Sequence, residues 1–169
     1  MAKASDTPRT SFSQFLSYFP EVPPPITLGE DTHRVFSRKN TPLPALVIEQ
    51  HLLPIETDPV DEFTEFIPCF QLVTSLDFIV LVYWRAGLMS YYYTVVTYNN
   101  RGEMIDRRII AGSYYQEGEI TRSVALFTED LQIAIASGQE HLDTLADPDA
   151  ADSTAYSLYF DDAGYIVED

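Results

Sequence analysis

Apolar and polar positions alternate most clearly between residues 78 and 110, FIVLVYWRAGLMSYYYTVVTYNNRGEMIDRRII. Two runs rich in β-branched and aromatic residues are separated by a short loop that contains Gly87. A third run follows the sequence NNRG at 99–102. Asn and Gly tolerate the positive φ of tight turns, so this pattern is typical of consecutive antiparallel strands. The segment predicts an antiparallel meander and sets the fold class.

Similar runs continue to the end of the chain. The sequence DDAG at 161–164 resembles NNRG, with two polar residues, one spacer and a glycine. An internal repeat and two independent hairpin turns explain this similarity equally well. We therefore predict a mainly β fold, built as an antiparallel meander that forms a curved sheet or a small open barrel. The predicted strands lie at 71–74, 78–85, 91–98, 103–111, 122–127, 131–137, 155–160 and 165–167.

Helix signals lie near the N-terminus. Ser11 and Gln14 have the spacing of a capping box, and an apolar stripe follows at helical spacing, formed by Phe12, Phe15, Leu16 and Phe19. Pro20 should end this helix. Asp58 followed by Pro59 predicts a second, short helix that runs to about Phe66.

The chain length suits one domain. At 169 residues, the protein is large enough to bury a sizeable core without disulfides or metals. We expect a flexible N-terminus at 1–10 and a single β-rich domain at 11–169. Residues 20–60 hold most of the prolines, so we interpret them as a Pro-rich arm with short strands near 35–37 and 46–50.

Charge excludes some partners. The net charge is −16, and residues 116–169 contain 13 acids and one base, Arg122. Nucleic acid is a poor partner for such a chain, because phosphate contacts require clustered Lys and Arg. No apolar run approaches the roughly 20 residues of a membrane-spanning helix. The acidic region predicts a solvated face or, as an alternative, a cationic partner.

Motifs for catalysis are absent from the sequence. It contains no dinucleotide-binding loop, P-loop or serine nucleophile elbow, so no catalytic residue and no cofactor are predicted. Cys69, the single cysteine, lies among apolar residues and is interpreted as core. The acidic stretch 147–152 departs from the EF-hand pattern. It leaves a weak metal-site candidate formed by Asp147, Asp149 and Asp152.

Aromatic residues offer one candidate binding surface. Successive strand residues point to opposite faces, so Tyr91 and Tyr93 should share one face and Tyr92 the other. Together with Trp84, the first two tyrosines form a candidate surface for a protein or a carbohydrate. The competing interpretation is that these rings belong to the core.

Three segments carry a resemblance to other proteins. They are FLSYFPEVPPPITL near the start, YYYTVVTYNNRGEMIDRRIIAG in the middle and YSLYFDDAGYIVED at the end. With these three segments in this order, the chain resembles a set of uncharacterised bacterial proteins that are often envelope-associated. The resemblance implies a single β-rich domain and carries over no catalytic residue.

Function remains open between three hypotheses at this point. A non-catalytic binding or interaction module is the first, a structural or assembly component the second, and a hydrolase the third. The N-terminus lacks the apolar segment of a signal peptide, so we expect a cytoplasmic protein if the chain is complete. If a leader was removed, an envelope or periplasmic location is expected instead.

Overall fold

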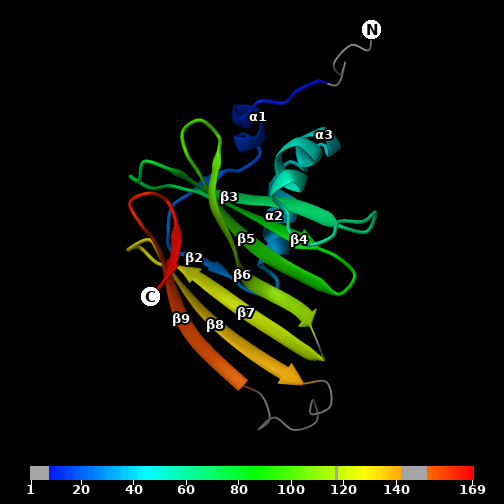
Figure 1. Cartoon of the computed structure of the whole chain (residues 1–169), viewed down its shortest axis with the longest axis vertical. Coiled ribbons are helices and arrows are strands. Elements are labelled where there is room, and N and C mark those ends of the chain that lie inside the picture. The colour runs from blue at the N-terminus through cyan, green and yellow to red at the C-terminus, as the bar shows by residue number, and fades with distance from the viewer. Residues whose placement is uncertain (1–7, 117, 142–151) are drawn as a thin grey trace.

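The fold was analysed in a computed structural model, which describes residues 8–116, 118–141 and 152–169. Over these residues the protein is mainly β, with ten strands in one mostly antiparallel open sheet and three helices, one of them N-terminal (Figure 1). The predicted fold class is confirmed. The strands are β1 Glu21–Val22, β2 Ile26–Leu28, β3 Glu65–Leu72, β4 Ile79–Ala86, β5 Ser90–Tyr98, β6 Met104–Gln116, β7 Glu119–Phe127, β8 Gln132–His141, β9 Asp152–Phe160 and β10 Ile166–Glu168.

The meander follows chain order from β3 to β10, and β1 extends it by pairing in parallel with β3. Its turns are as predicted. Gly102 and Gly164 have φ of 81° and 93°, and in both turns the side chain of the first residue, Asn99 or Asp161, accepts two backbone N–H bonds. The two hairpins are therefore closed in the same way.

The predicted N-terminal helix is also confirmed. Helix α1 spans Phe12–Leu16, and both hydrogen bonds of the capping box between Ser11 and Gln14 are formed. Phe15 and Phe19 are buried against the face of β4 and β5 that carries Leu81 and Val96. The same face receives α3 (Ala45–Val47) and the turns that follow it, a π-helical turn at Ile48–Leu52 and a 3-10 turn at Leu53–Ile55.

Two strands predicted in the Pro-rich arm are wrong. Residues 35–37 belong to helix α2, Thr32–Lys39, and residues 46–50 belong to α3 and the π-helical turn. The reason is the spacing of apolar and aromatic side chains. His33 and Phe36 lie one helical turn apart and contact the rings of Trp84 and Phe70 on the sheet, which only a helix allows.

The predicted helix from Asp58 to Phe66 is also wrong. Asp61 and Thr64 form a turn, and β3 begins at Glu65. Pro68 lies inside β3 beside a register shift, where a missing N–H is tolerated. The side-chain amide of Asn40 donates to the carbonyls of Pro68 and Cys69, so this part of the strand has hydrogen-bond partners outside the sheet.

Strands β4 and β5 are buried on both faces. One face packs against the helices, as described above. The other face, with Val82 and Val95, belongs to the main apolar cluster, which also includes Phe127, Ile133 and Leu158 from β7, β8 and β9. The sheet is thus bent so that its second half contributes to the same core as its first half. Figure 1 shows α1 and α3 at one end of the molecule and β7–β9 at the other.

Candidate functional site

A pocket lies where the sheet divides. Strand β6 pairs with β7 only up to Ser123, and β2 takes its place beside β7 from Ala125 onward. Gly29, which follows β2, and Gly112, where β6 meets β7, both line the pocket. The cavity has a volume of about 570 Å³. We call it the junction pocket, and its size lies within the usual range for small-molecule sites.

Three aromatic residues form one wall of the junction pocket. They are Trp84, Tyr91 and Tyr93, the set that the sequence singles out. Trp84 of β4 and Tyr93 of β5 are directly paired neighbours on one face of the sheet. Tyr92 points to the opposite face, and its hydroxyl donates to Asp58. The alternation of the tyrosine run is therefore as predicted. Trp84 and Tyr93 are buried, so the set is a pocket wall rather than an exposed platform.

The rings of this wall are held in place by helix α2. The His33 ring stacks on Trp84, with centroids 4.4 Å apart and planes 3° from parallel. Trp84 also contacts Tyr91, at 6.2 Å between centroids. One face of the Trp84 ring is therefore covered by His33, and a sugar cannot stack on that face while α2 stays in place.

Small side chains form the opposite wall. Ser123 donates to Ser137 across β7 and β8, which fixes both hydroxyls. Since these residues carry little side-chain volume, the space in front of the aromatic wall stays open. The residues of this wall include Ser123, Ala136, Ser137, Gly138, Thr154 and Ala155.

Polar atoms in and behind the aromatic wall lack partners. Trp84 Nε1 and His33 Nδ1 are buried and have no hydrogen-bond partner among the described residues. The buried Tyr93 hydroxyl lies near the Thr32 side chain and the His33 backbone N–H. A buried polar group without a partner costs about 1–3 kcal/mol.

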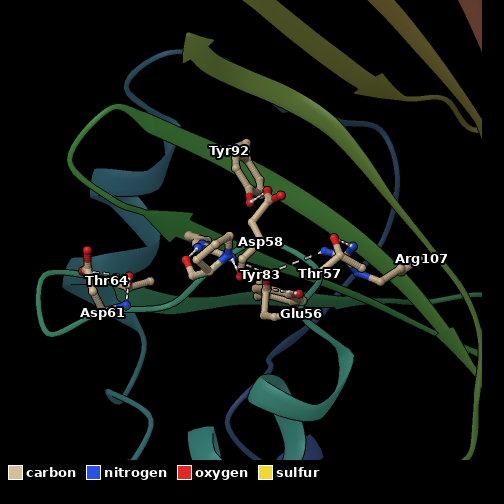
Figure 2. Close-up of polar contacts among 10 residues, drawn as sticks. Glu56, Thr57, Asp58, Asp61, Thr64, Tyr83, Tyr92 and Arg107 are labelled. Atoms are coloured by element: carbon tan, nitrogen blue, oxygen red, sulfur yellow. Dashed lines mark hydrogen bonds and ion pairs between the residues drawn. The ribbon is translucent and has the colours of Figure 1, made fainter. Parts of the chain in front are cut away.

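A second polar cluster, the Glu56 cluster, lies on the other face of β4 and β5 (Figure 2). Glu56 accepts hydrogen bonds from the Tyr83 hydroxyl and from Arg85 Nη1, both at 2.6 Å. Arg85 also donates to the backbone carbonyls of Asp58 and Pro59.

The remaining contacts of the Glu56 cluster reach two neighbouring strands. The Tyr92 hydroxyl of β5 donates to Asp58 Oδ2 at 2.6 Å. Arg107 of β6 donates to Thr57 Oγ1 at 3.0 Å, and its Nη2 lies 3.8 Å from the Glu56 carboxylate. Carboxylates and cations here neutralise each other and fasten the segment 56–59 to three strands. The geometry supports a structural role for this cluster.

Sequence reasoning missed the Glu56 cluster, although it contained a signal. Arg85 ends a run of seven apolar residues in a strand that is buried on both faces. A charged residue in such a strand needs a buried partner of opposite charge. The sequence offers several candidates among its acids, so it indicates that a partner exists without saying which one.

Cys69 and His51 do not line the junction pocket. Asp147 and Asp149 lie outside the described residues, and Asp152 begins β9. Within the described part of the chain, no group of three or more His, Cys, Asp or Glu could hold a metal. Cys69 is buried, and burial raises the pKa of its thiol. His51 stacks on Phe15 and bonds to Thr10, and burial lowers its pKa.

Buried tyrosines should make the protein unstable at high pH. Burial raises the pKa of five tyrosines above the ordinary value of about 10, most strongly those of Tyr83, Tyr92, Tyr93 and Tyr98 and less that of Tyr156. Their contribution to stability is complete below pH 10 and is lost as the pH rises toward the raised values. In an absorbance titration at 295 nm, we expect the four most strongly shifted of the 11 tyrosines to ionise only as the protein unfolds. Reversible titration of all 11 near pH 10 in the folded protein would contradict this.

Comparisons with known proteins identify no relative. No family model matches the chain, and neither a curated protein nor a solved structure matches it. The resemblance to uncharacterised bacterial proteins therefore stays a prediction. Within the described residues, no helix is long and apolar enough to cross a membrane. The structure defines the protein as a bent, open antiparallel sheet with an aromatic-walled pocket at the point where the sheet divides.

Proposed function

We propose that the protein is a non-catalytic binding module and that the junction pocket is its ligand site. The observation that carries the proposal is the pocket itself, which has a volume of about 570 Å³ and lies between an aromatic wall and a wall of small residues. Its ligand is a compact, largely apolar molecule, and this character follows from the lining of the pocket.

A small apolar ligand fits this pocket better than a carbohydrate. Sugar sites need an open aromatic face and many planar polar groups, and His33 covers one face of Trp84. The hydrolase hypothesis finds little support here. Among the described lining residues, the ionisable ones are Glu30, Arg122, Tyr91 and Tyr93, which do not include a nucleophile with an adjacent base.

Trp84 is the only tryptophan of the chain, so its fluorescence reports on the pocket. We expect the neutral dye Nile red, which is planar and carries a carbonyl acceptor, to bind saturably and quench Trp84 emission. At about 0.3 kcal/mol per non-hydrogen atom, a dye of about 24 such atoms binds with a Kd on the order of 10 µM. The measurement is a titration that follows both the dye and the Trp84 emission.

Two variants make this titration specific. Ser137→Phe places a ring at a lining position on the same face of β8 as the buried Ile135 and should weaken dye binding at least tenfold. Its matched control is Ala163→Phe, at an exposed turn position away from the pocket, which should bind the dye like the parent protein. Equal binding by both variants, or no saturable binding by the parent protein, would rule out the junction pocket as the site.

A further inference from the structure

One edge of the sheet is open along part of β9. Strand β10 pairs with residues 158–160 of β9, and the Asp169 N–H extends this contact to the Ser157 carbonyl at 2.9 Å. No described strand pairs with the outer side of β9 from Asp152 to Tyr156. We call this stretch the β9 edge.

The direction of the free backbone groups follows from the Ser157 contact. In an extended strand, the N–H and C=O of one residue point to the same side, and the side alternates along the chain. Because the Ser157 carbonyl points outward, the N–H and C=O of Ala155 and Ser153 point outward as well. The β9 edge thus offers two donors and two acceptors at the spacing of a strand.

The β9 edge lacks the features that normally protect an edge strand. Proteins block edges with proline, lysine, inward-pointing charges or bulges. The sequence STAYSLYF at 153–160 contains none of these residues, and its pairing with β8 shows no register shift. At the opposite edge of the sheet, β3 is covered by Pro68, by the Asn40 side chain and by β1. The two ends of the sheet therefore differ, and the β9 edge is the one without such protection.

Charge decides which strand fits there. Asp152 stands at one end of the β9 edge, and Asp161, Asp162, Glu168 and Asp169 stand in or beside the hairpin at its other end. Residues 116–169 as a whole carry a net charge of −12, from 13 acids and one base. A second copy of this chain would bring another 16 negative charges, which opposes pairing between copies. An extended segment rich in Lys or Arg gains from the same field.

We propose that the β9 edge binds an extended, basic segment of another protein by adding it as a strand to the sheet. Backbone hydrogen bonds to Ser153 and Ala155 would supply the register, and the acidic surroundings would select a cationic partner. This proposal does not depend on a ligand in the junction pocket, although Ser153 and Ala155 also border that pocket.

The test uses the whole chain and a ten-residue peptide of alternating lysine and threonine. We expect calorimetry to show binding, and amide hydrogen exchange at Ser153 and Ala155 to slow at least tenfold when the peptide is bound. A peptide of alternating glutamate and threonine should not bind. Equal binding of both peptides, or unchanged exchange at the two amides, would overturn the proposal.

A proline at position 155 tests the hydrogen bonds directly. Ala155→Pro removes an N–H that points away from β8, and proline is tolerated at such edge positions. It should weaken binding of the lysine peptide at least tenfold, whereas Ala155→Ser, which keeps the N–H, should bind within twofold of the parent protein. Ser153→Pro serves as the second variant if Ala155→Pro lowers the melting temperature. A dimer that both proline changes abolish would show that a second copy occupies the edge, and would overturn the choice of a basic partner.

Discussion

Replacing Arg85 with methionine is expected to lower the free energy of unfolding by about 3–5 kcal/mol. The side chains of Arg85 and Glu56 are only 7% and 2% exposed, and their closest atoms lie 2.6 Å apart. Without Arg85, the Glu56 carboxylate stays buried with Tyr83 as its remaining close donor. For a chain of this size, the change should lower the melting temperature by roughly 6–20 °C, measured by circular dichroism.

Two further variants separate the buried charge from general damage to the fold. In the double variant Glu56→Gln/Arg85→Met, the lone charge is removed, so part of the lost stability should return. Arg101→Ala removes the Arg101–Glu103 pair, whose side chains are 83% and 64% exposed, and should change the free energy of unfolding by less than about 1 kcal/mol. A double variant less stable than Arg85→Met would contradict the proposed origin of the effect.

The meander could be predicted because its signals are local. Alternation over 91–98 and the Asn99 and Asp161 turns depend on residues within about ten positions of one another. The capping box of α1 is local too, with Ser11 and Gln14 three positions apart. Each of these elements forms as expected, since nearby residues alone specify its backbone conformation.

The wrong predictions concern short apolar runs and ambiguous turn residues. Val35-Phe36 suits a strand by composition, yet His33 and Phe36 need helical spacing to reach β4 and β3. Asp58-Pro59 is a helix start and equally a turn signal. The turn was favoured because the Asp58 carbonyl and carboxylate bond to Arg85 and Tyr92, residues that lie 27 and 34 positions away. Contacts of that range cannot be derived from local pattern.

The junction pocket illustrates the same division. Alternation identified its aromatic wall, because Trp84, Tyr91 and Tyr93 lie on neighbouring strands of one hairpin. The facing wall comes from β7, β8 and β9, and small residues such as Ala136 carry no sequence signal of their own. The position of β2 beside β7 joins residues about 100 positions apart along the chain. A pocket built from such distant segments becomes visible only in the folded protein.

Gly112 should tolerate substitution poorly. Its φ is 135°, and a Cβ added there would lie 2.3 Å from the Tyr91 carbonyl oxygen and 2.5 Å from the Tyr92 Cα. Both contacts are with backbone, so no side chain can rotate away. Gly112→Ala combines backbone strain with overpacking, and we expect it to lower the free energy of unfolding by about 3 kcal/mol or more. Urea unfolding followed by circular dichroism measures this loss.

Gly118→Ala is the matched control for this change. Gly118 also has a positive φ, of 80°, but nothing lies within 4 Å of its added Cβ. The control should therefore show only the backbone strain, a loss of about 1 kcal/mol. The difference between the two variants isolates the close approach of β6 to β5 at the pocket. If Gly112→Ala folds and costs no more than Gly118→Ala, β6 can move away from β5, and the junction pocket is not held by this contact.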